Sequence, residues 1–202
     1  KNIMNYLAYK TLFEEILSAE TPAAPYDKPD YLNYTKLNQS RMKRWDKHLV
    51  LSDAILSKLQ EITSPQHWII ITEPWCGDAA HIVPFLIKIT EQNPLLSYEI
   101  QLRDSEPFLI EQYLTNGKSK SIPKLIARDE DGKDLFVWGP RPEGAHQLME
   151  ELHEAKADFE TIKIKLQNWY NDDKGEEICK ELGISASNCW VLLHRARLGL
   201  RD

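Results

Sequence analysis

The sequence predicts an α/β domain in which a central mixed sheet is covered by helices on both faces. Short runs rich in β-branched residues alternate with helical stripes from residue 49 onward. A turn at Asp131-Gly132 joins the last two of these runs in the manner of a β-hairpin. Alternation of this kind is typical of a sheet with a layer of helices on each side.

The elements follow in order along the chain. The predicted strands cover residues 67–72, 97–103, 124–128 and 134–138. The predicted helices cover residues 1–19, 31–62 in two pieces, 79–92 with an interruption at Pro84, 106–114 and 143–170. The proline-rich residues 21–29 connect the first two helical segments. We expect three parts: an N-terminal helical extension (1–48), the α/β domain (49–170) and a C-terminal tail (171–202).

Composition limits the classes of function. The 202 residues are 42% hydrophobic, which is enough for a core, and the net charge of −6 argues against non-specific nucleic-acid binding by the whole chain. No apolar run approaches the roughly 20 residues that span a bilayer, and residues 1–20 lack the apolar region of a signal peptide. Three cysteines are too few for a disulfide framework, so we expect a reducing, cytoplasmic setting.

Cys76 is the residue with the strongest chemical signal. It lies where a predicted buried strand passes into a helix, and the unpaired backbone N–H groups of a first helical turn favour a thiolate over a thiol. Gly77 is expected to let the backbone turn tightly and leave the sulfur accessible. Asp78 falls in the first helical turn, and its charge opposes a thiolate nearby. The sequence leaves the net direction of the Cys76 pKa open.

This loop resembles the active-site loop of thioredoxins. Residues 75–79 read Trp-Cys-Gly-Asp-Ala, against Trp-Cys-Gly-Pro-Cys in that family. Pro84 matches the proline that kinks the active-site helix, and Ile122-Pro123, in front of a predicted strand, matches the cis-proline segment. The resemblance covers about residues 49–157 and implies a thioredoxin fold, with the N-terminal helices added to it.

The resemblance also implies roles for neighbouring residues. The Pro123 loop would pack against the Cys76 sulfur, and the backbone of Ile122 would offer strand-like hydrogen bonds to a bound peptide or thiol. Trp75 would shield the sulfur. Supporting roles are therefore expected for five residues around Cys76: Trp75, Gly77, Asp78, Ile122 and Pro123.

Two departures from the family pattern limit the chemistry. Ala79 replaces the second cysteine, so no disulfide can close within the loop, and a mixed disulfide at Cys76 would need an outside thiol to resolve it. Ile70 stands where thioredoxins place a buried aspartate that assists the second cysteine. Dithiol reductase chemistry is not expected.

The sequence therefore favours monothiol chemistry at Cys76, either thiol–disulfide exchange or redox sensing through a sulfenic acid. The expected partners are proteins or low-molecular-weight thiols and disulfides. A redox-inactive binding module built on the same fold is the alternative. Neither a membrane nor a cofactor is expected as a partner, and the sequence does not indicate the oligomeric state.

The C-terminal tail carries a second resemblance. Residues 176–202 read as helix, glycine turn and helix, and are similar to the end of region 4 in bacterial RNA polymerase sigma factors of the extracytoplasmic-function type. That resemblance implies DNA or polymerase contacts by four residues of the second helix: Asn188, Trp190, His194 and Arg195. Acidic and basic residues balance in the tail, which favours instead an amphipathic hairpin packed on the body or on a partner.

Other candidate sites are weak. The six histidines are scattered and show no metal-ligand spacing, and no glycine-rich phosphate loop or serine nucleophile motif is present. His81, in the helix after Cys76, is expected to be a surface residue. The acidic run 129–131 is expected to be a solvated hairpin tip, because it lacks further oxygen ligands for calcium.

Overall fold

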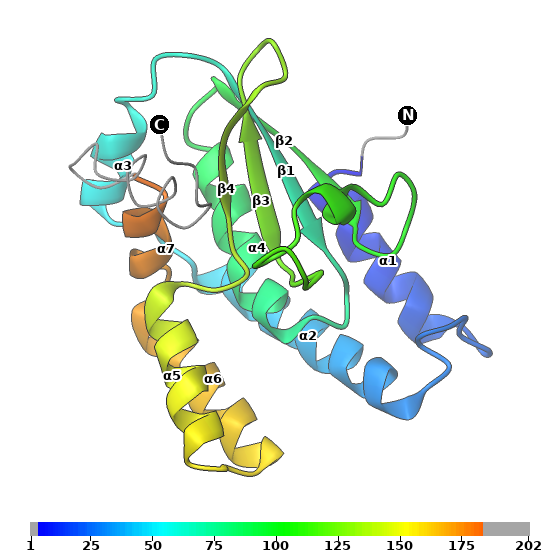
Figure 1. Ribbon diagram of the computed structural model, residues 1–202. Helices are drawn as coiled ribbons and strands as arrows, with labels where there is room; N and C mark the ends of the chain where they lie inside the picture. Colours follow the sequence, from blue (N-terminus) through cyan, green and yellow to red (C-terminus); the bar gives the residue numbers. More distant parts are fainter. Residues whose placement is uncertain (1–3, 184–202) are drawn as a thin grey trace. The chain divides into compact units, whose positions relative to one another are not determined.

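The computed structural model describes residues 4–183 (Figure 1). The helices are α1 (Tyr6–Ser18), α2 (Pro29–His48), α3 (Asp53–Leu59), α4 (Gly77–Thr90), α5 (Glu143–Glu154), α6 (Phe159–Asp173) and α7 (Glu176–Glu181), with a 3₁₀ turn, η1 (Leu109–Gln112). The strands are β1 (Gln66–Thr72), β2 (Leu96–Leu102), β3 (Lys124–Arg128) and β4 (Asp134–Trp138). The chain divides into two compact units, Lys1–Pro140 and Arg141–Asp202. The three-part division expected from the sequence stays a prediction.

The four strands form one mixed sheet in the order β2-β1-β3-β4. β1 pairs in parallel with β2 and antiparallel with β3, and β3 and β4 form the hairpin predicted around Gly132. The central residues of β1, Ile69 to Ile71, are buried, as expected for a strand covered on both faces. The predicted α/β class and the four predicted strands are confirmed.

The N-terminal helices belong to the core of the first unit. α2 begins with Pro29, which suits the first helical turn because that N–H would have no partner there. Trp45 of α2 packs edge-on against Phe85 of α4, with ring centroids 5.0 Å apart. Tyr9 of α1 is buried, and its hydroxyl lies 3.2 Å from Thr72 Oγ1 at the end of β1. The helices predicted outside the family resemblance therefore support the end of β1 that leads to Cys76.

Two predicted helices differ in the structure. Residues 106–114 form only the short turn η1, because Pro107 disfavours helical backbone at the residue before it and Phe108 is left-handed (φ 55°). The single helix predicted for 143–170 is two helices, α5 and α6. Lys156 is left-handed between them, and the Asp158 carboxylate accepts the Thr161 N–H as the N-cap of α6.

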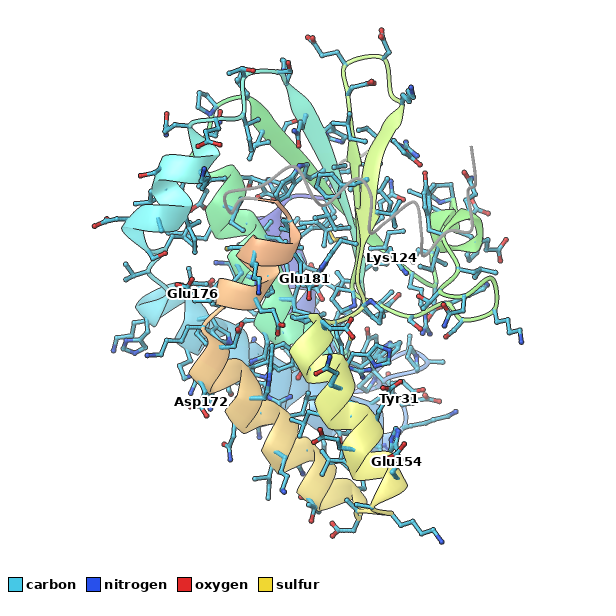
Figure 2. All side chains as sticks on the ribbon, turned by 60° about the vertical axis from the view of Figure 1, so that its left-hand side comes forward. Tyr31, Lys124, Glu154, Asp172, Glu176 and Glu181 are labelled. Atoms are coloured by element: carbon cyan, nitrogen blue, oxygen red, sulfur yellow. The ribbon has the colours of Figure 1, made fainter. Side chains whose placement is uncertain are left out.

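The second unit contains α5, α6 and α7. The Glu181 and Glu177 carboxylates of α7 accept hydrogen bonds from the Glu143 and Gly144 N–H groups at the start of α5 (2.6 and 3.1 Å; Glu181 is labelled in Figure 2). α7 confirms the first helix predicted for the tail. The predicted second helix lies outside the described residues, together with its possible nucleic-acid contacts Asn188, Trp190, His194 and Arg195. The sigma-factor resemblance stays a prediction.

Candidate functional site

Cys76 lies at the junction between β1 and α4. The backbone turns from 73 to 76, and the Cys76 N–H donates to the Glu73 carbonyl (3.0 Å). Cys76 is the N-cap of α4, with extended backbone angles (φ −76°, ψ 115°), and the helix begins at Gly77. The cysteine therefore precedes the unpaired N–H groups of the first turn of α4.

The Cys76 sulfur is held against the segment before β3. Its Sγ donates to the Ile122 carbonyl at 3.4 Å, and the Ile122–Pro123 peptide is cis. Only the thiol form can make this bond, since a thiolate has no proton to donate. Cys76 is 7% exposed, so the accessible sulfur expected from the sequence is wrong for this conformation. The structure does bring Cys76, Ile122 and Pro123 together.

α2 supports the loop from another side. Asn38 is buried, and its Nδ2 donates to the Pro74 carbonyl (2.9 Å) while its Oδ1 accepts from Arg41 Nη1 (3.0 Å). A Cβ added at Gly77 would lie 3.5 Å from Arg41 Nη1, an ordinary contact, and Gly77 is not left-handed. Neither the backbone angles nor the packing at Gly77 therefore require glycine, and a role for Gly77 in the turn stays a prediction.

Trp75 lies between two side chains from different elements. Tyr31 of α2 meets the indole edge-on at 5.5 Å, and the Arg103 guanidinium lies over the indole with Cζ 4.6 Å from its centroid. Among residues 4–183 the buried indole Nε1 has no hydrogen-bond partner. Arg103 follows β2 directly, and its N–H donates to the carbonyl of Thr72, the last residue of β1 (3.1 Å). Trp75, the residue before the cysteine, therefore lies between a tyrosine and an arginine.

Glu73 is a buried acid that the sequence analysis missed. Its Oε1 accepts the Asp104 N–H (2.9 Å), and Tyr26 hydrogen-bonds the same carboxyl group. Burial raises the pKa of Glu73, which the Asp104 N–H and Arg103 only partly offset. The signal was present: an acidic residue directly follows a strand of buried isoleucines.

The Pro123 edge is closely packed. Gly139, after β4, is left-handed (φ 109°), and a Cβ there would lie 2.3 Å from the Pro123 carbonyl oxygen. Lys124, labelled in Figure 2, is 4% exposed, and its Nζ donates to Thr115 Oγ1 (2.7 Å). Burial lowers the pKa of Lys124 to about 8. A buried lysine therefore follows Pro123 directly, and the Pro123 carbonyl oxygen lies against the backbone of Gly139.

Asp78 and His81 complete the first turns of α4. Asp78 is buried. Burial lowers the pKa of the Arg41 guanidinium, and the charges of Tyr34 and Asp78 partly oppose this shift. His81 is 2% exposed and its Nδ1 accepts the Trp45 indole N–H (3.0 Å), so the expected surface histidine is wrong. Within the described part of the chain, no group of three or more His, Cys, Asp or Glu side chains is placed to hold a metal.

Comparisons with known proteins agree with this geometry. A family model described as "Thioredoxin" matches residues 25–156. The chain belongs to the thioredoxin family. A crystal structure of an HIV epitope-scaffold shares the thioredoxin-family fold of this chain, with 18% identity and a TM-score of 0.55 over 75% of this chain and 88% of that one. A protein of unknown function from Pseudomonas aeruginosa matches with 17% identity and a TM-score of 0.49, over 71% and 90%. The comparison with curated proteins found no match.

Two features distinguish this chain from the thioredoxin loop pattern. Ala79, at the position of the second cysteine, is buried in the first turn of α4. Ile70, at the position of the buried aspartate, is fully buried among apolar residues. A buried acid of this chain, Glu73, lies on the turn itself. No helix among residues 4–183 has the length and apolar character required to cross a bilayer.

Proposed function

We propose that this thioredoxin-family protein carries out monothiol thiol–disulfide exchange at Cys76. One observation carries the proposal: Cys76 is the N-cap of α4, and its Sγ lies 3.4 Å from the Ile122 carbonyl beside Pro123. The helix start favours a thiolate, and the neighbouring segment offers backbone groups to a bound partner. The expected partners are protein or low-molecular-weight disulfides in a reducing, cytoplasmic setting.

The reaction needs two exchanges. The Cys76 thiolate attacks one sulfur of a partner disulfide, the partner S–S bond breaks, and the departing thiolate takes the electron pair and then a proton. The product is a mixed disulfide at Cys76. Because residue 79 is alanine, an outside thiolate must attack the partner sulfur and release the Cys76 thiolate. A peroxide that transferred one oxygen to the same thiolate, and itself left as water or an alcohol, would give a sulfenic acid and make Cys76 a redox sensor.

The test is to trap the mixed disulfide. The full chain is incubated with bis(hydroxyethyl) disulfide, and the adduct is located by peptide mass mapping. We expect the adduct on Cys76 in the wild type and its loss in Cys76→Ser. If the wild type shows no adduct at Cys76 while a denatured sample is fully modified, the proposal is wrong.

Replacing Ala79 with cysteine tests the geometry on which the proposal rests. Residue 79 follows Cys76 by three positions at the start of α4, a spacing that allows a disulfide across the first turn. We expect Ala79→Cys to lose two hydrogens on mild oxidation. The matched control is the double variant Cys76→Ser/Ala79→Cys, in which that loss is absent.

The low exposure of Cys76 favours one other candidate, a binding module without redox chemistry. Under this alternative, Cys76→Ser binds its partners as the wild type does, and no mixed disulfide is recovered from extracts. Under the proposal, the same variant loses the disulfide-linked partners that the wild type retains.

A further inference from the structure

Arg103 occupies a defined position beside Cys76. Its backbone N–H bonds to the end of β1, and its guanidinium lies over the ring of Trp75, the residue before the cysteine. The electrostatic attraction that raises the pKa of Arg103 comes first from Asp104 and then from Glu73 and Cys76. The guanidinium therefore lies over the residue that directly precedes Cys76, on the turn that carries the cysteine.

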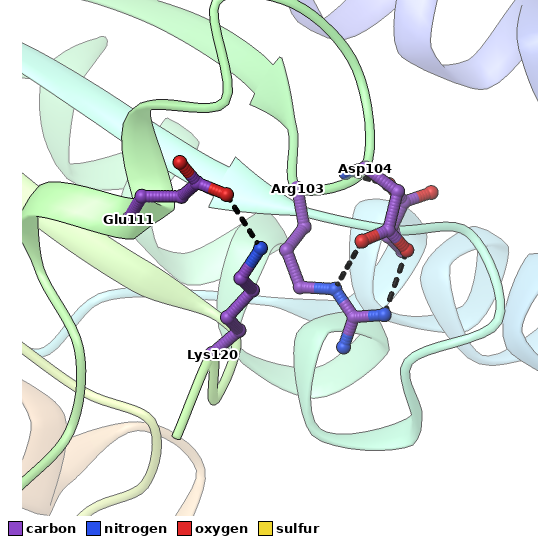
Figure 3. Close-up of polar contacts among 5 residues, drawn as sticks. Arg103, Asp104, Glu111 and Lys120 are labelled. Carbon is purple, nitrogen blue, oxygen red and sulfur yellow. Dashed lines mark hydrogen bonds and ion pairs between the residues drawn. The ribbon is translucent and has the colours of Figure 1, made fainter. Parts of the chain in front are cut away.

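The Arg103 guanidinium is held in place by hydrogen bonds and is partly exposed to solvent. Its Nε and Nη2 donate to the two carboxylate oxygens of Asp104 (2.8 and 2.7 Å; Figure 3). The Asp104 N–H is held in turn by the buried Glu73 carboxyl. The Arg103 side chain is 25% exposed and that of Asp104 is 51% exposed. Their orientation is therefore set by the protein, while one side of the pair faces solvent.

The ion pair with Asp104 does not use all the hydrogen-bond donors of Arg103. Within residues 4–183, Arg103 Nη1 has no acceptor, and Figure 3 shows it directed away from the Asp104 contacts. Asp104 occupies only Nε and Nη2, so an incoming carboxylate can bind at Nη1 while the Arg103–Asp104 contact remains. Arginine is well suited to such shared binding, because its planar fork offers five N–H donors.

We infer that Arg103 is a specificity-determining residue that selects small disulfides bearing a carboxylate near the sulfur as partners of Cys76. This inference rests on the proposed exchange at Cys76. The carboxylate binds the exposed edge of Arg103 above Trp75 while one sulfur of the partner meets Cys76. The bonds that break and form are those of the exchange described above, and the carboxylate is unchanged by it.

Three disulfides of equal chain length test the inference: dithiodipropionate (anionic), bis(hydroxyethyl) disulfide (neutral) and cystamine (cationic). The rate of adduct formation at Cys76 is measured by mass spectrometry at low salt. The wild type is expected to prefer the anion to the cation, and Arg103→Gln is expected to lower the ratio of the anion rate to the neutral rate about three- to fivefold, the size of one nearby charge contact in water-like surroundings. Arg103→Lys should retain part of the preference.

Lys133→Gln is the matched control. It removes the same charge from the exposed turn after β3, a strand that begins beside Pro123 and leads away from it. We expect its anion-to-cation ratio to equal that of the wild type. Raising the salt concentration shortens the screening length from about 30 Å to under 10 Å. It should therefore remove the preference of the wild type for the anionic disulfide and leave the rate with the neutral disulfide unchanged.

The outcomes separate the two proposals. An unchanged ratio in Arg103→Gln, with a normal neutral rate, overturns the role of Arg103 and leaves exchange at Cys76 intact. Equal slowing of all three disulfides also overturns it, because Arg103 would then act on the thiol and not on the partner. Failure of the neutral disulfide to modify wild-type Cys76 overturns the exchange proposal and this inference with it.

Discussion

Cys76 in the first unit and Cys179 in the second are both buried cysteines, one at the start of a helix and one within a helix, and their surroundings differ. Cys76 precedes α4, donates to the Ile122 carbonyl in the segment before β3 and follows Trp75, over which the Arg103 guanidinium lies. Cys179 lies within α7, where burial first and then Glu176 and Asp173 raise the pKa of its thiol to about 12. Burial alone therefore does not set the chemistry of a cysteine, and the charges and backbone groups around the sulfur decide it.

The largest expected difference is in alkylation. At pH 8 we expect iodoacetamide to label Cys179 about 10³-fold more slowly than an ordinary exposed thiol, because a pKa near 12 leaves so little thiolate. Cys76 is expected to react faster than Cys179 by at least about 10²-fold. Timed labelling followed by peptide mass mapping measures both rates in one sample.

Labelling in denaturant is the control, since both thiols should then react at the same rate. Similar alkylation rates of Cys76 and Cys179 in the folded protein would contradict the predicted difference between the two thiols. A folded protein in which Cys179 reacts first would reverse it and remove the reason for assigning the chemistry to Cys76.

The second prediction concerns what holds Cys76 in place. Gly139→Ala is expected to destabilise the protein by about 3 kcal/mol, because the left-handed backbone and the 2.3 Å approach to the Pro123 carbonyl both exclude a Cβ. Gly77→Ala is the matched change on the other side of Cys76, and it should cost less than about 0.5 kcal/mol. Urea unfolding of both variants tests this, and equal costs would contradict it.

The third prediction uses the buried lysine of the Pro123 edge. The pKa of Lys124 is about 8 in the folded protein, below the ordinary value of 10.5. Between pH 8 and pH 10.5 the unfolded chain therefore binds more protons than the folded protein, so the free energy of unfolding rises with pH in this range. We expect Lys124→Met to raise the free energy of unfolding by about 2 kcal/mol at pH 7. The gain should shrink as the pH rises through 8 and be absent above about 10.5.

Unfolding curves at pH 7 and pH 10.5 measure the effect of Lys124→Met. Lys133→Met, in the exposed hairpin turn, is the control and should show no such pH dependence. A gain that is the same at both pH values would mean that packing, and not the buried charge, is responsible.

The sequence predicted the parts of the site that depend on local pattern. The run of isoleucines specified β1, and Cys76, Pro84 and Pro123 indicated the family because their chain positions relative to the strands are characteristic. The helix predicted at 106–114 failed for a related reason, since Pro107 and the left-handed Phe108 outweigh the helical pattern there. Elements of this kind are determined by neighbouring residues, and a proline overrides a helical spacing of apolar residues.

The rest of the site depends on contacts distant in sequence. Asn38 bonds to Pro74, Arg103 lies over Trp75, and Tyr26 reaches Glu73 from the segment before α2. None of these partners has a spacing that a single sequence reveals, because the fold brings the segments together. His81 was mistaken for a surface residue for the same reason, since its partner Trp45 lies on another helix.

The smallest predicted effect returns to the two cysteines. Glu176 is an exposed residue in the first turn of α7, and among the charges around Cys179 it contributes most to the raised pKa. Because a nearby negative charge opposes a thiolate, Glu176→Gln should lower the pKa of Cys179 slightly and speed its alkylation about two- to threefold. Asp172→Asn, a similar loss of charge at an exposed residue of α6 labelled with Glu176 in Figure 2, should leave the rate unchanged. If both variants have the wild-type rate, the charge of Glu176 has no effect and burial is the main cause of the inertness of Cys179. The contrast with Cys76 would then lie in the helix start and the Ile122 carbonyl, and not in charge.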